Sequence, residues 1–392
     1  MALSPYYRAG YGHTEPQTNR SGEHGCLPLK SRVSAFGRLF CYCSQMRIVV
    51  RGTNWIGDSV MAIPAMRRLR RSFPEAQIAL HTRRWAEGIF RDADFLDEII
   101  AFDQAGSKLK TVREQARLLK AGNFDLAVIL PNSFESAATV RLAGIPRRFG
   151  YKADRRGFLL SDPFPVPGWK NEQHESEHYL NLVGFVEKQI FGSAVVVEPE
   201  PVSLNVSDKR RDEAIEILRS LGVDASKRVV GFGSGSTNSL AKRWPAERFA
   251  LLSDKFADEL GSQVVLLGSE GEQGVADEVK RIAKHDLIDL TGRTDLAQAT
   301  ALLSVLDLFV SNDMGLAHIA GAVGTPTLTI FGPTNETTTR PLGNRVTIMR
   351  EPVECAPCML RECPIDHRCM TGIKPEMVFE TAVKMLENRT EK

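Results

Sequence analysis

An acidic residue follows the first apolar strand of the sequence, where the chain turns into a helix. The strand Arg47–Arg51 runs into Gly52-Thr-Asn-Trp-Ile-Gly-Asp58, and a helical pattern follows. A carboxylate at a helix start can be an N-cap that stabilises the helix by about 1 kcal/mol. It can equally act as a general base, because the helix N-terminus keeps a carboxylate ionised. Residue type and position leave both interpretations of Asp58 open.

A second group of candidate side chains follows the strand predicted over Arg228–Gly231. The loop there contains glycines and serines and the pair Ser236-Thr237, and Lys242 follows shortly afterwards. Glycine lets backbone amides approach a phosphate, and hydroxyls add hydrogen-bond donors. The pattern therefore indicates a diphosphate site with Lys242 as its cation. A flexible surface loop with a solvated basic residue is the alternative.

Two further strands of the same half end in polar residues. The strand Leu306–Val310 runs into Ser311-Asn-Asp-Met-Gly-Leu-Ala-His318, which opens a helix whose free amides favour an anion. We expect Asp313 to accept hydrogen bonds from sugar hydroxyls, and Glu270, after the strand Gln263–Leu267, to hold a ribose. The structural alternatives are an N-cap for Asp313, a core histidine for His318 and a first-turn charge for Glu270.

The elements that must position these residues alternate along the chain. Short apolar strands and amphipathic helices follow one another from Met46, break at the proline-rich passage 162–169 and the loose segment 197–201, and then resume. Alternation of this kind predicts parallel βαβ units and an α/β fold with two doubly wound sheets. We expect a disordered extension over 1–45, an acceptor-binding domain over 46–200, a nucleotide-binding domain over 201–374, and a C-terminal helix over 375–392 that packs back on the first domain.

Composition narrows the class of protein. The 392 residues are 43% hydrophobic and 25% charged, and 50 Lys and Arg against 48 Asp and Glu give a net charge of +2. That balance argues against nucleic-acid binding, and no apolar stretch is long enough to suggest a membrane span or a signal peptide. We therefore expect a cytoplasmic protein. The first strand also lacks the G-x-G-x-x-G turn of a dinucleotide site, which disfavours an oxidoreductase.

Several of these loops together resemble one known family. The runs Arg51-Gly-Thr-Asn-Trp-Ile-Gly-Asp58, Leu130-Pro-Asn-Ser133, Ala143-Gly-Ile-Pro146, Ala241-Lys-Arg-Trp-Pro245, Ser311–His318 and Phe331-Gly-Pro-Thr334 are similar to those of ADP-heptose:lipopolysaccharide heptosyltransferases. The resemblance implies a GT-B fold and inverting transfer without a catalytic metal. It also implies ADP-heptose as donor and the inner-core heptose of lipopolysaccharide as acceptor. The alternatives are an acceptor on Kdo or a protein, or, from other classes, a nucleotide-sugar sensor or an oxidoreductase.

The same resemblance assigns roles to individual residues. It implies that Asp58 is the catalytic base, that Lys242 meets the diphosphate and that Glu270 lies on the adenosine side. It places the sugar nucleotide against Asp313, Met314, Gly315, Leu316 and His318. Met314 departs from the family, which usually has Ser or Thr there, and its thioether cannot donate a hydrogen bond.

The expected acceptor is an anionic glycolipid, and the first domain supplies residues to match it. Guanidinium and ammonium groups bind carboxylates and phosphates well. As acceptor-binding candidates we list Asn54, Trp55, Arg83, Arg84, Asn132, Lys152, Arg155 and Arg156. The basic members are also expected to touch anionic headgroups at the cytoplasmic face of the inner membrane. A solvated basic surface is the alternative.

Four cysteines are crowded near the C-terminus. Cys355, Cys358, Cys363 and Cys369 lie within fifteen positions, a density typical of a structural zinc site. The alternative is a reduced loop or local disulfides.

Overall fold

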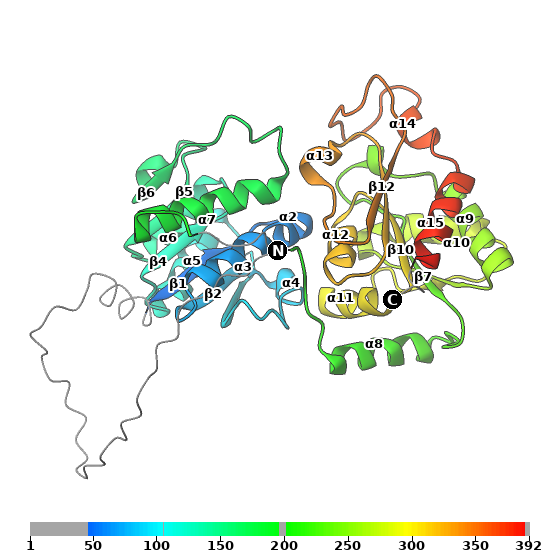
Figure 1. Cartoon of the computed structure of the whole chain (residues 1–392), viewed down its shortest axis with the longest axis horizontal. Helices are drawn as coiled ribbons and strands as arrows, with labels where there is room; N and C mark the ends of the chain where they lie inside the picture. Colours follow the sequence, from blue (N-terminus) through cyan, green and yellow to red (C-terminus); the bar gives the residue numbers. More distant parts are fainter. Residues whose placement is uncertain (1–45, 105, 196–200, 389–392) are drawn as a thin grey trace, which may run out of the picture. The chain divides into compact units, whose positions relative to one another are not determined.

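The computed structural model describes residues 46–104, 106–195 and 201–388. The extension expected over 1–45 and most of the loose segment expected over 197–201 lie outside these residues. The described chain forms two six-stranded sheets with helices packed against them (Figure 1). Every pair of neighbouring strands is parallel, as the βαβ alternation predicts.

Both sheets have the same strand order. The first sheet consists, from edge to edge, of β3 (Glu98–Phe102), β2 (Gln77–Arg83), β1 (Arg47–Arg51), β4 (Leu126–Ile129), β5 (Arg147–Tyr151) and β6 (Asp162–Phe164). The second consists of β9 (Ile288–Asp289), β8 (Gln263–Leu266), β7 (Val229–Gly233), β10 (Leu308–Asn312), β11 (Thr327–Phe331) and β12 (Val346–Arg350). The strand order reverses direction between β1 and β4 in the first sheet and between β7 and β10 in the second. Ligands bind at such reversal points in these folds.

The helices that connect the strands complete each layer. The first sheet is accompanied by α2 (Ile56–Met61), α3 (Ile63–Ser72), α4 (Arg84–Glu87), α5 (Lys108–Ala121), α6 (Phe134–Leu142), η1 (Gly157–Leu159) and α7 (Glu175–Phe191). The second is accompanied by α8 (Asp208–Ser220), η2 (Leu240–Lys242), α9 (Ala246–Leu260), η3 (Glu270–Glu272), α10 (Gln273–Ile282), α11 (Leu296–Val305), α12 (Gly315–Ala322), α13 (Glu336–Thr339), α14 (Arg368–Thr371) and α15 (Pro375–Glu387).

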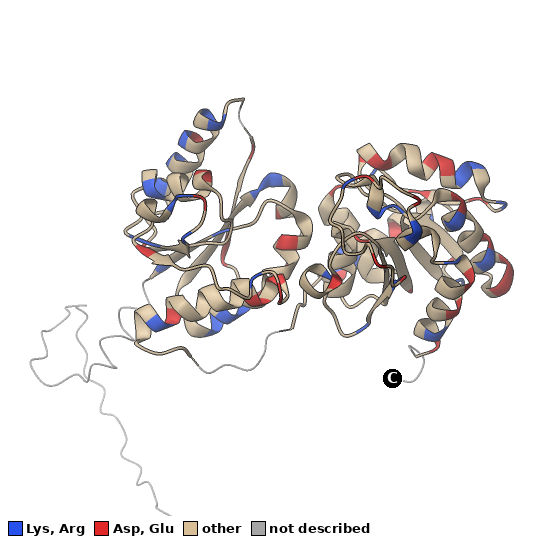
Figure 2. Cartoon of the chain, turned by 90° about the horizontal axis from the view of Figure 1, so that it is seen from above, with Lys and Arg blue, Asp and Glu red and all other residues tan. Residues whose placement is uncertain are grey.

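Burial on both faces explains why the central strands are almost wholly apolar. In β1, Ile48 and Val50 belong to one core cluster and Val49 to another, because successive side chains point to opposite faces. Acidic and basic residues are interspersed along the helices (Figure 2), as the small net charge suggests. Among the described residues, no helix is both long and apolar enough to cross a membrane.

The C-terminal helix begins at the predicted residue, Pro375, and ends at Glu387, but its partner differs from the expected one. α15 packs on α9 and β10 of the second sheet, and the rings of Phe256 and Phe379 lie 5.3 Å apart. The expectation that this helix returns to the first domain is therefore wrong. Its buried residues Val378 and Phe379 complete a core cluster of the second sheet, which gives the apolar face a nearer partner.

Candidate active site

Asp58 lies in the first turn of α2, directly after the switch-point strand β1. The N-cap is Trp55, which makes no side-chain capping bond, so the N-cap interpretation of Asp58 is wrong. The carboxyl is largely buried, and burial is the main reason why its pKa rises from 3.8 to about 6. Glu175 raises this pKa further, whereas Lys170 and Lys242 lower it. A carboxylate with a pKa near 6 is a stronger base than an exposed aspartate.

The residues that surround Asp58 on the first domain were not predicted from the sequence. Glu175 starts α7 and pairs with Lys170, with Nζ and Oε2 3.2 Å apart. Tyr179 is buried one turn further along α7, and burial together with Asp58 and Glu175 raises its pKa well above 10. No motif marks these residues. The only local signal is the helix start that His174 caps through its ring nitrogen.

On the second sheet, Lys242 and Asp313 form an ion pair. Lys242 Nζ lies 2.7 Å from Asp313 Oδ2, and the hydroxyl of Thr334 donates to the same oxygen at 2.7 Å. Met314, not Asp313, is the N-cap of α12, so the N-cap interpretation of Asp313 is also wrong. The pair places a cation beside a free helix N-terminus, and an ammonium there would attract a phosphate.

The two helix starts, α2 and α12, are packed together. A Cβ at Gly315 would come within 2.6 Å of Ile56, and one at Gly57 within 3.0 Å of His318 Nε2. Burial lowers the pKa of His318 to about 4, so its ring is neutral at pH 7. The contact brings the predicted donor loop against the residue next to Asp58. Because neither glycine could carry a side chain without displacing a neighbour, both are needed for this approach.

The remaining donor candidates lie after the ends of β7, β8 and β10. Ser236 is buried and its carbonyl accepts from Arg243, whereas Thr237 is exposed and its hydroxyl lies 3.4 Å from that of Ser269. Glu270 is exposed at the start of η3, as a ribose contact would require. Leu316 is buried in α12. Met314 directs its sulfur towards Gly233, where a Cβ would lie 2.6 Å away.

Most acceptor candidates line the carboxyl edge of the first sheet. Asn54, Trp55, Lys152 and Arg155 are exposed, and Asn132 is half-buried after β4. Two of the basic residues already have partners. Arg84 pairs with Asp103 at 2.6 Å, and the Arg83 guanidinium lies over the ring of Phe102 and donates weakly to Gln104.

Arg156 differs from its expected role. It is completely buried, and its guanidinium donates to the carbonyls of Tyr151, Pro131 and Ser133 and to the side chains of Ser136 and Asn132. A charged group with this many internal acceptors is satisfied by the protein itself. Arg156 therefore ties the loop after β5 to the loop after β4 and leaves no side-chain surface for a ligand.

The four cysteines are free thiols. Within the described ranges, no group of three or more His, Cys, Asp or Glu side chains is arranged to hold a metal ion. The structural zinc that the cysteine spacing suggests therefore stays a prediction. Burial raises the pKa of Cys369, and the other three cysteines act in the same direction, so this thiol stays protonated at neutral pH.

The segment that carries these cysteines holds the predicted donor loop in place. His367 Nε2 donates to the carbonyl of Ala241 at 2.6 Å, and the amide of Ala241 donates to the carbonyl of Arg361 at 3.0 Å. The amide of Met359 donates to the carbonyl of Pro333 at 2.8 Å. These bonds fix the residues next to Lys242 and Thr334, the two groups that contact Asp313.

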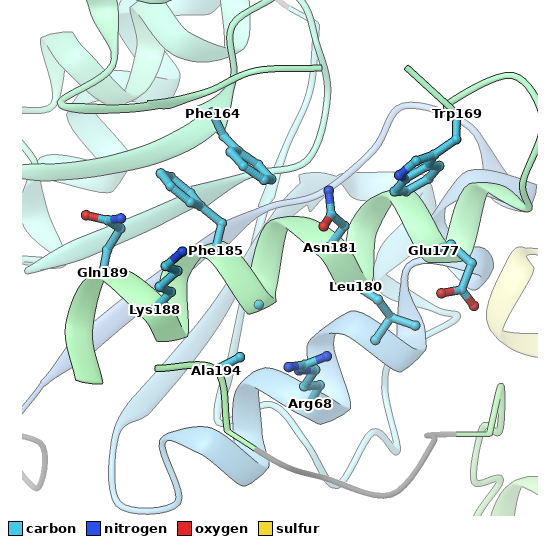
Figure 3. A pocket seen from close by; sticks show the side chains of 11 residues that line it. Arg68, Phe164, Trp169, Glu177, Leu180, Asn181, Phe185, Lys188, Gln189 and Ala194 are labelled. Atoms are coloured by element: carbon cyan, nitrogen blue, oxygen red, sulfur yellow. The ribbon is translucent and has the colours of Figure 1, made fainter. Parts of the chain in front are cut away.

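A pocket of about 600 Å³ extends along α7, apart from all the predicted site residues (Figure 3). The stacked rings of Phe164 and Phe185 form part of its wall, with centroids 4.2 Å apart. Its arginine, Arg68, is bound in bidentate fashion by Glu187. The arginine of the pocket is therefore neutralised by a carboxylate, and two of its aromatic rings are stacked on each other.

The geometry agrees with the comparisons to known proteins. A family model described as glycosyltransferase family 9 (heptosyltransferase) matches residues 112–368. The chain belongs to this family and is a glycosyltransferase. It is 29% identical to lipopolysaccharide heptosyltransferase 2 of Escherichia coli K12 over 314 residues, which covers 78% of this chain and 88% of that protein. It is also 29% identical to lipooligosaccharide heptosyltransferase 2 of Haemophilus ducreyi over 318 residues, with the same coverage.

Solved structures support the fold. The structure of ADP-heptose lps heptosyltransferase II of E. coli superposes with a TM-score of 0.76 at 26% identity, and the match covers 88% of this chain and 99% of that one. A family 9 glycosyl transferase of Veillonella parvula gives 0.77 at 21% identity, covering 88% and 98%. The predicted GT-B fold is confirmed.

Proposed function

We propose that this heptosyltransferase moves L-glycero-D-manno-heptose from ADP-heptose to the inner-core heptose of lipopolysaccharide. The similarity to a protein named ADP-heptose lps heptosyltransferase II supports the donor and the lipopolysaccharide acceptor. The observation that carries the proposal is the position of Asp58. The carboxylate of Asp58, in the first turn after β1, is close enough to Lys242 for the lysine charge to lower its pKa. Lys242 belongs to the proposed donor loop of the other sheet. One group can accept a proton while the other stabilises a departing diphosphate.

The reaction then follows from the charges. Asp58 accepts the proton of the acceptor hydroxyl, and the freed oxygen attacks the anomeric carbon of the donor sugar from the face opposite the diphosphate. The new C–O bond forms as the bond to ADP breaks, so the anomeric configuration inverts. ADP gains negative charge, which Lys242 and the amides of the α12 N-terminus would stabilise. No step requires a metal, and the expected site of action is the cytoplasmic face of the inner membrane.

A donor panel tests the proposal. The full chain is incubated with ADP-heptose, UDP-glucose or GDP-mannose and with lipopolysaccharide truncated after its first heptose. Nucleotide release and the mass of the acceptor are then measured. The proposal predicts that only ADP-heptose adds mass, by one heptose. Turnover with another donor would contradict the donor assignment.

The acceptor alternatives give different results in the same assay. An enzyme specific for Kdo would act only on lipopolysaccharide lacking all heptose, and one specific for a protein would act on neither lipid. A nucleotide-sugar sensor would bind ADP-heptose without turnover, and replacing Asp58 would then change nothing.

A further inference from the structure

Two exposed aromatic side chains are held together at the carboxyl edge of the first sheet. Phe134 begins α6 after β4, and Phe158 lies in η1 after β5. Their ring centroids are 6.1 Å apart, yet the two residues are 49% and 75% exposed. Single exposed apolar residues are common, but neighbouring ones that form a patch indicate an interaction surface.

The fold fixes this pair through a buried charge. The Arg156 guanidinium, two residues before Phe158, donates to the carbonyl of Ser133 at 3.2 Å and to the hydroxyl of Ser136 at 3.1 Å. These acceptors flank Phe134. A buried guanidinium needs a hydrogen-bond acceptor for each of its donors. Because the acceptors of Arg156 lie beside Phe134 and Arg156 itself lies beside Phe158, the same hydrogen bonds keep the two exposed rings next to each other.

One cation lies beside Phe158, and a second lies three positions before it in the sequence. Lys152 and Arg155 are exposed, and a Cβ at Gly157, next to Phe158, would lie 3.0 Å from Cγ of Lys152. Asp154 is the acidic neighbour, and among the ion pairs of the described residues none involves Lys152, Asp154 or Arg155. Aromatic rings flanked by unpaired cations match the boundary between acyl chains and anionic headgroups.

We propose that Phe134, Phe158, Lys152 and Arg155, the aromatic–basic patch, rest on the surface of an anionic phospholipid bilayer. The proposal rests on the proposed function, because a glycolipid acceptor is anchored in such a surface. The carboxyl ends of parallel strands share one edge of a sheet, so the patch lies on the same edge as Asp58. Contact with the bilayer would therefore bring the catalytic edge towards the acceptor.

Binding to vesicles tests the patch without turnover. The full chain is sedimented with phosphatidylcholine vesicles with or without phosphatidylglycerol. We expect binding that requires phosphatidylglycerol, that falls more than about tenfold in Phe134→Ser/Phe158→Ser and that falls about fivefold in Lys152→Glu. The matched controls are Leu251→Ser, at an equally exposed leucine of α9, and Lys284→Glu. Unchanged binding of the double phenylalanine variant would overturn the proposal.

Turnover on two forms of the acceptor separates this proposal from the proposed function. The double phenylalanine variant should act on a deacylated, water-soluble acceptor at the wild-type rate and lose activity on the intact acceptor in vesicles. Equal losses on both forms would mean that the rings hold the acceptor sugar, which overturns the bilayer proposal. Failure of the wild type on both forms, with vesicle binding intact, would contradict only the proposed function.

Discussion

At the scale of single residues, Asp58 links stability to chemistry. Its pKa of about 6, against 3.8 for an ordinary aspartate, means that the folded state holds the proton more tightly than the unfolded state. Ionising Asp58 therefore lowers the free energy of unfolding. The full loss is present above about pH 6, and there is none below pH 4. We expect Asp58→Asn to raise the free energy of unfolding by about 1–3 kcal/mol at pH 8 and by almost nothing at pH 4, while lowering kcat at least about a hundredfold.

Denaturant titrations at the two pH values and a pH–rate profile measure these effects. Wild-type turnover should fall about tenfold per pH unit below pH 6. Asp286→Asn, at an exposed carboxylate, is the control and should change neither quantity. A normal rate in Asp58→Asn would remove Asp58 from the mechanism.

As residues in the segments after strand ends, where such folds bind ligands, Asp58, Lys242 and Asp313 were predictable, and their roles stay predictions. Arg156 and Glu175 were not. A charged residue is exposed by default, and the acceptors that bury Arg156 come from a loop more than twenty positions away.

At the scale of elements, too, the features set by the local sequence were predictable and those set by distant contacts were not. β1, β7 and β10 were predicted because they are short apolar runs buried on both faces. The proline-rich passage 162–169 interrupts the predicted alternation, yet β6 lies in it; a three-residue edge strand can tolerate a proline. The spacing of the cysteines predicts a metal site, but nothing in the sequence predicts that their segment contacts the loop of Lys242.

Those contacts give a prediction for His367. Replacing it by alanine removes the bond to the carbonyl of Ala241, next to Lys242. One lost hydrogen bond of about 1 kcal/mol should raise the donor KM about fivefold and leave the acceptor KM unchanged. His367→Gln, which keeps a donor, should restore part of the effect, and steady-state kinetics with each substrate varied measure it. Equal changes in both KM values would indicate a general loss of structure instead.

At the scale of the whole described molecule, one buried arginine joins elements of both sheets. Arg210 of α8 pairs with Asp92 at 2.8 Å, beyond α4 of the first sheet, and donates to the carbonyl of Ala297 in α11 at 2.6 Å. Burial opposes ionisation of Asp92, but bonds from Ser207 and Arg210 outweigh it and lower the pKa of Asp92. The pair therefore stabilises the fold at pH 7, and this contribution is lost as the pH falls below about 4.

Arg210→Ala should consequently leave a carboxylate and a carbonyl without their partner and cost about 3 kcal/mol. Because the lost bonds join the two sheets, we expect calorimetry at pH 7 to resolve two unfolding transitions where the wild type shows one. Arg219→Ala, which removes an exposed ion pair from the same helix, should change stability by less than about 1 kcal/mol. If Arg210→Ala unfolds in a single transition at the wild-type temperature, the sheets are coupled by other contacts, of which the packing of Gly57 on His318 is the foremost.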